Sequence, residues 1–588
     1  MKEKWILVNR KKEFEKLHSE IKINPLITRL LVNRGIDSGV KAEKFLNGSK
    51  NCLNDGSLMK DMIKGVNLIK EAIINNKKIV IYGDYDCDGV CSTAILYKTL
   101  EKLNANFTYY IPNREDEGYG MNSNRIKCLK EEGAEYLLTC DNGISAINEV
   151  KVAKDLGLKV IITDHHDIPF VMENNKKIYT IPEADCVINP KQEDCLYEFK
   201  DLCGAGVALK FAIELYKSMD KPYEELSELY ELASIATVCD VVQLLDENRI
   251  IVKEGLKVIN KKPSVGILEL LKITGIDKKK IEEYHFGFVL GPCINATGRL
   301  ETADLSVNLL IEKDKDKAKE LAKNLYELNN ERQNLTLESL ERIDEKIKLE
   351  LKDEKVILVY DSEVHESIAG IVAGRIREKY NLPTIVLTKG KDMPKGSGRS
   401  IEGYNMYEEL NKHKELISKF GGHTMAAGLS VEEDKIPLLK EALTKDCPLN
   451  DDDIVKVVRI DSPLSIDNIN EQIINEIENL KPFGKGNPSP LFAMKNASVS
   501  RVFFMGKEKN ILKFRFVMDN NMYIEGINFD KYEEFKEMYI GEFGEDKYLE
   551  LYNSTYGSFN LDVVYYPTIN EYNGKKSIQL NIKNFRIA

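Results

Sequence analysis

The sequence KVIITDHHD, at residues 159–167, joins an apolar run to a polar triplet. Residues 160–162 are β-branched, which is typical of a short buried strand. Asp164, His165 and His166 follow almost at once, where such a strand would end in a loop. Loops at the carboxyl ends of parallel strands carry the ligand sites of open α/β sheets. One carboxylate and two imidazoles at this position therefore predict metal chemistry.

The segments around this triplet alternate between helices and strands. After a helical region over residues 1–70, we expect strands at residues 78–82, 106–111, 135–140, 159–163 and 185–188, with helices between them. This alternation predicts a mostly parallel sheet with helices on both faces. The α/β domain is expected to span residues 71–310.

Acidic residues gather where three of these strands end. The first strand is followed by Asp84, Asp86 and Asp88, the third by Asp141 and the fourth by the triplet, while Asp240 ends an apolar helix. Such carboxylates repel one another unless a cation lies among them. The alternative is that each aspartate caps a helix, which is the better interpretation of a single one. Three alternating aspartates exceed one cap, and Asp86 and Asp88 would point the same way in an extended backbone.

The residue types indicate which ions would fit. Carboxylates and imidazoles without thiolates favour Mn²⁺ or Mg²⁺ over Zn²⁺ or Fe²⁺. A cluster of this size fits two ions better than one, and paired ions are a common arrangement for hydrolysing phosphoesters.

The composition is that of a globular protein with several domains. The chain has 588 residues, of which 43% are hydrophobic and 30% charged, and a formal net charge of −11. The negative charge is weak evidence against a nucleic-acid partner, although a local basic groove suffices to bind phosphates. There is no membrane-length apolar run and no apolar signal core at the start. We therefore expect a cytoplasmic protein whose 11 cysteines are reduced.

Two regions with different sequence patterns follow the α/β domain. Residues 311–350 are highly charged with apolar residues at helical spacing, which predicts a long connecting helix. Residues 351–450 return to an α/β pattern. Three segments rich in small residues, 291–300, 396–400 and 421–428, are expected to be loops that approach a ligand closely.

The last region, residues 451–588, contains successive short strands that predict a small β-barrel. Phe503, Phe514 and Phe516 occur there together with Arg501, Lys507 and Lys513. The phenylalanines are candidates either for stacking on a single nucleic-acid strand or, at least as readily, for the barrel core.

Nine motifs in a fixed order resemble the DHH family of phosphoesterases. They are GDYDCDG (83–89), IPNREDEGYG (111–120), CDNGIS (140–145), TDHHD (163–167), LCGAGVALK (202–210), ATVCDVV (236–242), INATGRL (294–300), GSGRSIEGYN (396–405) and GGHTMAAGLS (421–430). Within that family the chain is most similar to bacterial single-strand-specific 5′→3′ DNA exonucleases. The resemblance implies a DHH catalytic domain, a connecting helix, a DHH-associated substrate-binding domain and a C-terminal oligonucleotide-binding (OB) fold.

The resemblance also implies roles for individual residues. It places the metal ligands at Asp84, Asp86, Asp88, Asp141, His165 and Asp240, with Asp86 and Asp88 the more direct ligands of the first motif. Asp141 would bridge two ions, and His166 would bind an ion or contact the scissile phosphate. Asp164 would orient a histidine from outside the ligand shell. The contacts to substrate phosphates would be Arg299, His365, Arg375, Ser397, Arg399 and His423, while Cys293 replaces an arginine that is usual in the family.

The implied activity is hydrolysis of single-stranded DNA from the 5′ end by a two-metal mechanism, releasing 5′-mononucleotides in DNA repair and recombination. Mn²⁺ is the preferred ion and Mg²⁺ an alternative. Single-stranded DNA is the implied partner of a monomeric protein, and a single-strand-binding protein and a helicase are further partners that the resemblance suggests. Two alternatives stay open. One is a phosphoesterase for short oligonucleotides or cyclic dinucleotides, which would not need the barrel. The other is a non-catalytic DNA-binding scaffold, which would lose metal ligands.

Overall fold

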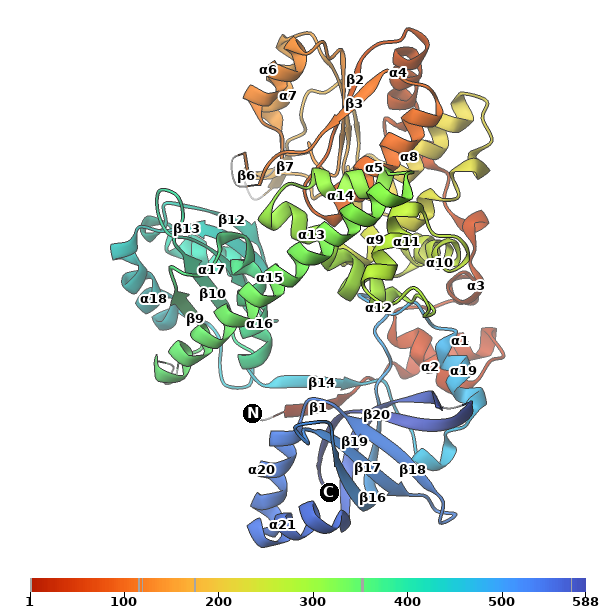
Figure 1. Cartoon of the computed structure of the whole chain (residues 1–588), viewed down its shortest axis with the longest axis vertical. Coiled ribbons are helices and arrows are strands. Elements are labelled where there is room, and N and C mark those ends of the chain that lie inside the picture. The colour runs from red at the N-terminus through yellow and green to blue at the C-terminus, as the bar shows by residue number, and fades with distance from the viewer. Residues whose placement is uncertain (1–2, 115–116, 119, 174–175, 351–353, 573) are drawn as a thin grey trace. The chain divides into compact units, whose positions relative to one another are not determined.

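The computed structural model describes the chain apart from residues 1–2, 115–116, 119, 174–175, 351–353 and 573 (Figure 1). The described residues form two compact units. The first is Leu53–Lys456, and the second joins Glu3–Cys52 to Val457–Ala588. The N-terminal residues thus cluster with the C-terminal region.

A five-stranded parallel sheet organises the first part of unit 1 (Figure 1). Its order is β3-β2-β4-β5-β8, and all neighbouring strands are parallel. The strands are β2 (Ile79–Tyr82), β3 (Phe107–Tyr110), β4 (Tyr136–Cys140), β5 (Lys159–Thr163) and β8 (Cys186–Ile188). The predicted parallel sheet is confirmed. The three strands with acidic ends, β2, β4 and β5, are direct neighbours.

Helices cover both faces of this sheet. Ile79 and Ile81 of β2 lie in one apolar core, and Val80 and Tyr82 lie in another. This alternation follows from the two-residue period of a strand and explains why every residue of β2 is buried. The helices of the first core include α4 (Met62–Ile74), α5 (Cys87–Lys102) and α8 (Gly204–Ser218), and those of the second are α6 (Ser123–Glu131) and α7 (Ile147–Asp155).

A hairpin and a set of helices complete this part. They are β6 (Phe170–Glu173), β7 (Lys176–Tyr179), α9 (Leu229–Cys239), α10 (Asp246–Lys261), α11 (Val265–Ile273), α12 (Glu283–His285), the π-helix η4 (Phe286–Leu290), α13 (Gly291–Leu300), α14 (Asp304–Ile311) and α15 (Lys315–Glu350). The long helix α15 confirms the predicted connector.

One prediction about this part is wrong, because residues 291–300 form helix α13 instead of a loop. The small residues serve close packing. A Cβ atom added to Gly298 would lie 2.3 Å from the backbone oxygen of Tyr85, and one added to Gly291 would lie 2.2 Å from the sulfur of Cys239.

The second α/β part of unit 1 has a mixed sheet of order β12-β13-β11-β10-β9. Its elements are β9 (Ile357–Tyr360), α16 (Ala369–Tyr380), β10 (Thr384–Thr388), β11 (Lys395–Arg399), α17 (Met406–Lys412), β12 (Lys419–His423), β13 (Ala426–Ser430) and α18 (Ile436–Lys445). The expectation of loops at 396–400 and 421–428 is wrong, since most of these residues lie in strands. Gly396 is required by packing within the sheet, because its Cβ would lie 2.2 Å from the oxygen of Val386.

Unit 2 is built on a closed barrel. The sheet order is β15-β16-β17-β18-β20-β19, and an additional β16–β19 pairing closes it. The strands are β15 (Ser462–Pro463), β16 (Phe492–Met505), β17 (Ile511–Val517), β18 (Tyr523–Asn528), β19 (Tyr556–Tyr572) and β20 (Lys575–Ile587), with α20 (Tyr532–Phe543) and α21 (Glu545–Ser554) between β18 and β19. This confirms the predicted barrel. Phe514 and Phe516 are fully buried, so they belong to its core and not to a stacking surface.

The N-terminal elements pack within the same unit. They are β1 (Glu3–Leu7), α1 (Lys11–Glu20), α2 (Pro25–Asn33) and α3 (Gly39–Asn47), accompanied by β14 (Lys456–Ile460) and α19 (Glu471–Glu478). Strand β1 pairs with β14. The buried Arg34 donates to Asn487 and to the backbone oxygen of Pro488, which ties the helices to the segment before the barrel. Among the described helices, none combines the length and the apolar content that crossing a bilayer requires.

Candidate metal centre

The loop after β2 places three carboxylates by starting a helix. Asp86 is the N-cap of α5, and its Oδ1 accepts hydrogen bonds from the backbone N–H groups of Asp88 (2.9 Å) and Gly89 (3.0 Å). The expectation of an extended backbone from Asp86 to Asp88 is therefore wrong. The capping interpretation holds for one oxygen of Asp86, while a carboxylate oxygen of the same residue still lies among those of Asp84 and Asp141.

Asp88 points toward a second helix N-terminus. Its two carboxylate oxygens accept hydrogen bonds from the backbone N–H groups of Gly204 (2.6 Å) and Ala205 (2.8 Å) at the start of α8. Unpaired N–H groups and the helix dipole both favour an anion there. Asp88 is thereby fixed while buried, although burial and the charge of Asp86 raise its pKa to about 6.

Asp141 occupies the centre of the cluster. Its backbone has φ +61°, which is unusual for a residue other than glycine. Its Oδ1 lies 3.0 Å from Nε2 of His165 and 3.9 Å from Nδ1 of His166. A Cβ atom on Gly204 would lie 2.6 Å from this same oxygen, so only glycine lets α8 approach so closely.

Asp164 of the triplet uses its oxygens to hold other groups. Oδ1 accepts from the backbone N–H groups of His165 (2.7 Å) and His166 (3.1 Å) and lies 2.7 Å from Nδ1 of His166, while Oδ2 accepts from the N–H of Ile144 (2.9 Å). Burial alone would raise its pKa, but the hydrogen bond and charge of His166 outweigh it and lower the pKa to about 2. This arrangement suits an anchor better than a metal ligand.

Asp240 is the C-cap of α9. Its Oδ2 lies 3.8 Å from Nε2 of His165, which is also 3.5 Å from Oδ2 of Asp88. Val241 follows with φ +57° and is 58% exposed. A β-branched residue in this conformation is strained, and such strain clusters at functional sites. We assigned Val241 no role from the sequence, and the available signal was its place in the motif ATVCDVV, at residues 236–242.

The predicted ligands thus come together in three overlapping groups. Within each group, one ligand atom per residue lies within 4.8 Å of the others. The groups are Asp84, Asp86 and Asp141; Asp88, His165 and Asp240; and Asp141, His165 and His166. Asp141 and His165 each belong to two groups, which links them into one cluster.

The electrostatics of this cluster fit bound cations. Burial and neighbouring carboxylates raise the pKa of Asp84 and Asp141 well above the usual value, and that of Asp240 to about 8. Oδ1 of Asp84 and Oδ1 of Asp141 are buried, and neither has a hydrogen-bond donor with suitable geometry among the described residues. Unsatisfied buried carboxylate oxygens are costly unless a cation binds them. Oxygen and imidazole donors without thiolates are the set that Mn²⁺ and Mg²⁺ accept.

Next to the cluster lies a pocket lined with arginine. It has a volume of about 640 Å³, and its lining includes Arg114, Arg299, Ser397 and Arg399. Burial, Arg114 and Arg332 lower the pKa of Arg299 to about 10, and burial, Arg377 and Arg114 lower that of Arg399. Mutually repelling guanidinium groups favour a bound anion, and arginine suits phosphate in particular.

The six predicted phosphate contacts are not all brought together. Arg299, Ser397 and Arg399 line the arginine pocket, and Arg299 donates to the backbone oxygen of Ser367 (2.7 Å). His365 caps a short helix, accepting from the N–H of Ser367 (3.3 Å). The exposed Arg375 lies 3.7 Å from Glu378. His423 ends β12; the pKa of Asp167 is lowered chiefly by its hydrogen bond with Lys191 and to a smaller extent by His423.

Arg114 lines the same pocket, although we had not assigned it a role. Its guanidinium lies 5.3 Å from the ring centre of Tyr85, in the loop between Asp84 and Asp86. The available signal was its place in the motif IPNREDEGYG, at residues 111–120.

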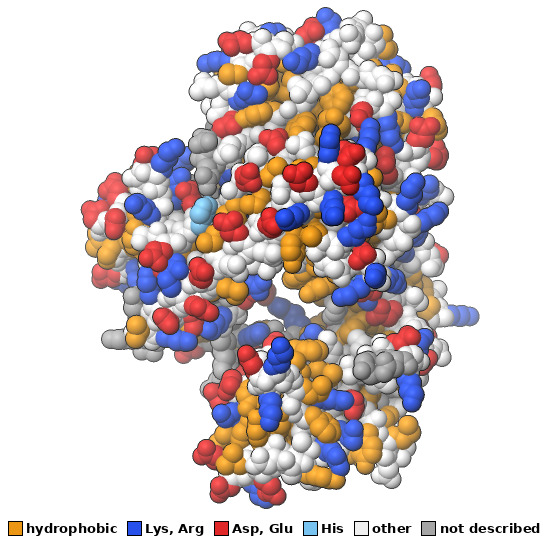
Figure 2. Space-filling view, viewed as in Figure 1, with side chains coloured by type: hydrophobic (Ala, Val, Ile, Leu, Met, Phe, Trp, Pro, Cys, Tyr) orange, Lys and Arg blue, Asp and Glu red, His pale blue; other side chains and the backbone are white. Residues whose placement is uncertain are grey.

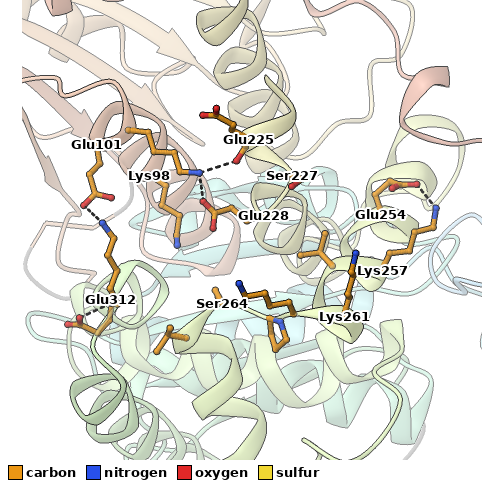
Figure 3. A pocket seen from close by; sticks show the side chains of 16 residues that line it. Lys98, Glu101, Glu225, Ser227, Glu228, Glu254, Lys257, Lys261, Ser264 and Glu312 are labelled. Atoms are coloured by element: carbon orange, nitrogen blue, oxygen red, sulfur yellow. Dashed lines mark hydrogen bonds and ion pairs between the residues drawn. The ribbon is translucent and has the colours of Figure 1, made fainter. Parts of the chain in front are cut away.

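A separate pocket of about 750 Å³ contains none of the predicted site residues (Figure 3). Three of its six lysines form ion pairs with glutamates of the same pocket: Lys102 with Glu228 at 2.6 Å, Lys257 with Glu254 at 2.7 Å and Lys313 with Glu101 at 2.8 Å. Acidic and basic side chains are likewise interspersed over the face of unit 1 seen in Figure 2. Paired charges of this kind are a solvated surface and give no reason to expect an ionic ligand.

Comparisons with known proteins agree with this arrangement. Residues 78–237 match the N-terminal domain of the DHH family, residues 353–447 the DHHA1 domain and residues 460–584 the RecJ OB domain. The single-stranded-DNA-specific exonuclease RecJ of Bacillus subtilis is 35% identical over 97% of this chain and 69% of its own length. That of Escherichia coli is 33% identical over 83% of this chain and 86% of its own length.

Solved structures show the same likeness. The crystal structure of RecJ from Thermus thermophilus in complex with Mn²⁺ has a TM-score of 0.81 and 26% identity, covering 100% of this chain and 80% of that one. A crystal structure of exonuclease RecJ bound to manganese has a TM-score of 0.58 and 31% identity, covering 68% of this chain and 97% of that one. With the three domains in the same order, this chain belongs to the RecJ family of DHH phosphoesterases.

Proposed function

We propose that this protein is a metal-dependent exonuclease that degrades single-stranded DNA from its 5′ end and releases 5′-mononucleotides in DNA repair and recombination. The observation that carries the proposal is the juxtaposition of two oppositely charged clusters. A buried group of carboxylates lies beside a pocket lined by arginines, and Arg114 influences the pKa of both Asp84 and Arg299. A DNA strand bound at this junction would have one phosphate at the cations and the neighbouring phosphate among the arginines.

We propose two divalent cations, with Mn²⁺ preferred and Mg²⁺ an alternative. Asp84, Asp86 and Asp141 would hold one, and Asp88, His165 and Asp240 the other, with Asp141 shared between them. Such cations lower the pKa of water and neutralise charge that develops on the phosphate. The similar structures with Mn²⁺ support a divalent cofactor.

The chain itself would position the substrate. Asp164 fixes the ring of His166, whose side chain is 41% exposed and can contact the scissile phosphate. Arg299, Arg399 and Arg114 would bind the terminal 5′-phosphate, which would set the polarity and restrict cleavage to an end. The contact from Arg299 to the backbone of Ser367 links the helix that carries Arg299 to the second α/β part.

Two alternatives are less well supported. A phosphoesterase for short substrates would not need the closed barrel that matches the RecJ OB domain. A non-catalytic scaffold would lose ligands, whereas every predicted metal ligand is present in the cluster. We further propose a monomeric, cytoplasmic protein that works with a single-strand-binding protein and a helicase, and these assignments rest on the family resemblance.

The test is a nuclease assay with Mn²⁺ or Mg²⁺ on single strands labelled at the 5′ or the 3′ end, with duplex as a comparison. We expect labelled mononucleotides at once from the 5′-labelled strand and only late from the 3′-labelled one. Asp141→Ala should abolish hydrolysis with an unchanged circular dichroism spectrum. Equal cleavage of duplex, or full activity of the variant, would refute the proposal.

A further inference from the structure

One face of the continuous helix formed by α12, η4 and α13 is open to solvent. Tyr284, Phe288, Pro292, Asn295 and Arg299 are exposed or partly exposed and follow one another at intervals of three or four residues. This spacing puts them on one side of a helix. Within α13, residues 293, 294 and 296–298 are buried. Residues 285, 287, 289 and 300 are also partly exposed, but only Tyr284 and Phe288 are exposed in this helix. We call the side formed by the five residues Tyr284, Phe288, Pro292, Asn295 and Arg299 the open face.

The open face passes the metal centre. Asn295 accepts a hydrogen bond from the backbone N–H of Cys87 (2.9 Å), between the ligands Asp86 and Asp88. Arg299, at one end, lines the arginine pocket. At the other end, the backbone oxygen of Phe286 accepts from the sulfur of Cys239 (3.4 Å), the residue before Asp240. The open face thus runs from the phosphate pocket past the metal ligands to an aromatic end.

The aromatic end carries two large exposed rings. Tyr284 is 60% and Phe288 is 66% exposed, and their rings are stacked with centres 4.7 Å apart and planes 21° from parallel. Phe288 lies within a π-helix, an element that is frequent at functional sites. The exposed lysine run 278–280 precedes the rings in the chain. Exposed aromatic rings near basic residues are the usual means of holding single-stranded nucleic acid.

We propose that the open face is the track for the strand downstream of the cleaved bond, and that Tyr284 and Phe288 stack on its bases. This inference rests on the proposed function, which puts the 5′-phosphate in the arginine pocket. Eleven residues separate Phe288 from Arg299, about 16 Å along a helix. The rings would therefore meet nucleotides beyond the first from the 5′ end, so a strand must exceed a minimal length to reach them.

The test compares the affinity of Tyr284→Ala, Phe288→Ala and the double variant for 5′-phosphorylated single strands. Binding is followed by fluorescence anisotropy with EDTA present, so that nothing is hydrolysed. We expect affinity for a long oligonucleotide to fall by about tenfold per ring, because each ring that stacks on a base contributes to binding. Affinity for a dinucleotide should not change. In the wild type, 2-aminopurine placed at successive positions should be quenched a few nucleotides from the 5′ end, and the double variant should lose this quenching.

The matched control is Tyr223→Ala, which removes an exposed tyrosine outside the open face and should leave binding unchanged. Both rings are at the surface, so the variants should melt at the wild-type temperature. Unchanged affinity of the double variant for long strands would overturn the inference, as would an equal loss for the dinucleotide. If wild type cleaves single strands from the 5′ end and the variants bind normally, only this inference fails. If wild type neither binds nor cleaves single strands, the proposed function fails with it.

Discussion

The metal centre and the arginine pocket are built on the same principle with opposite sign. In the first, burial and neighbouring carboxylates raise the pKa, as at Asp141 and Asp240. In the second, burial and neighbouring guanidinium groups, among them that of Arg114, lower the pKa of Arg299 and Arg399. Each is an unfavourable gathering of like charges that a ligand of the opposite charge would relieve. One cluster therefore suits cations and the other phosphate.

The two regions differ in how they are held. The carboxylates sit on the ends of neighbouring strands and on helix termini, in positions that backbone hydrogen bonds fix. The arginines come from α13, from β11 and from the loop that carries Arg114, and they reach the pocket with long side chains. We therefore expect changes at the metal centre to affect stability and activity together, and changes in the arginine pocket to affect substrate binding alone.

The largest effect is expected from Asp141→Asn, which should lower the cleavage rate by at least about 1,000-fold. The same change should stabilise the metal-free protein by about 1–3 kcal/mol, because it removes a buried carboxyl group whose Oδ1 has no hydrogen-bond donor with suitable geometry among the described residues. The control is Asp164→Asn, since Asp164 is equally buried but fully hydrogen-bonded and should lose stability. Urea unfolding in the presence of EDTA measures the free energy of unfolding of both variants. Stability changes of the same sign would contradict the contrast between the two aspartates.

The next effect is expected from Gly204→Ala. The new Cβ would lie 2.6 Å from Oδ1 of Asp141, so α8 or the carboxylate must move. A shift of this size should lower activity about 100-fold and weaken the binding of Mn²⁺. Isothermal titration with Mn²⁺ and the nuclease assay measure the two losses. Gly374→Ala is the control, because a Cβ there meets no atom within 4 Å. Normal Mn²⁺ affinity in Gly204→Ala would show that close approach of α8 is not required.

In the arginine pocket, Arg399→Gln should weaken cleavage of 5′-phosphorylated strands about 10- to 100-fold, from the loss of charge-assisted hydrogen bonds. The stabilisation of the protein by Mn²⁺ should not change. The exposed Arg375 provides a comparison, because it lies outside the pocket lining although the resemblance implies a phosphate contact. A loss in Arg375→Gln as large as in Arg399→Gln would extend the phosphate site beyond the pocket. Cleavage kinetics of Arg399→Gln and Arg375→Gln on strands with and without the 5′-phosphate measure the two losses.

The strand ends could be predicted from the sequence because the two signals, a β-branched run and the acidic residues after it, lie next to each other in the chain. A buried strand of β-branched residues followed by acids can be recognised without knowing its neighbours. Asp86 could not be assigned fully, because its cap depends on α5 starting at Cys87. The glycine-rich segments were predicted as loops, yet Gly298 and Gly396 serve close packing against distant atoms. Arg114 was missed for the same reason, since its partners in the pocket come from remote segments.

The smallest effect is expected in the pH dependence of metal-induced stabilisation. In the metal-free protein, burial and neighbouring carboxylates raise the pKa of Asp88 to about 6 and that of Asp240 to about 8. An unfolded aspartate loses its proton near pH 4. Between about pH 4 and pH 8 the folded state therefore holds more protons than the unfolded state, and its stability falls as the pH rises. Mn²⁺ takes the place of these protons, so the rise in melting temperature on adding Mn²⁺ should be larger by a few degrees at the alkaline end of this range.

Melting curves with Mn²⁺ or EDTA between about pH 4 and pH 8 measure this rise. The Asp141→Asn variant should show a smaller change, and a rise in melting temperature that is independent of pH would mean that the carboxylates are already ionised without metal.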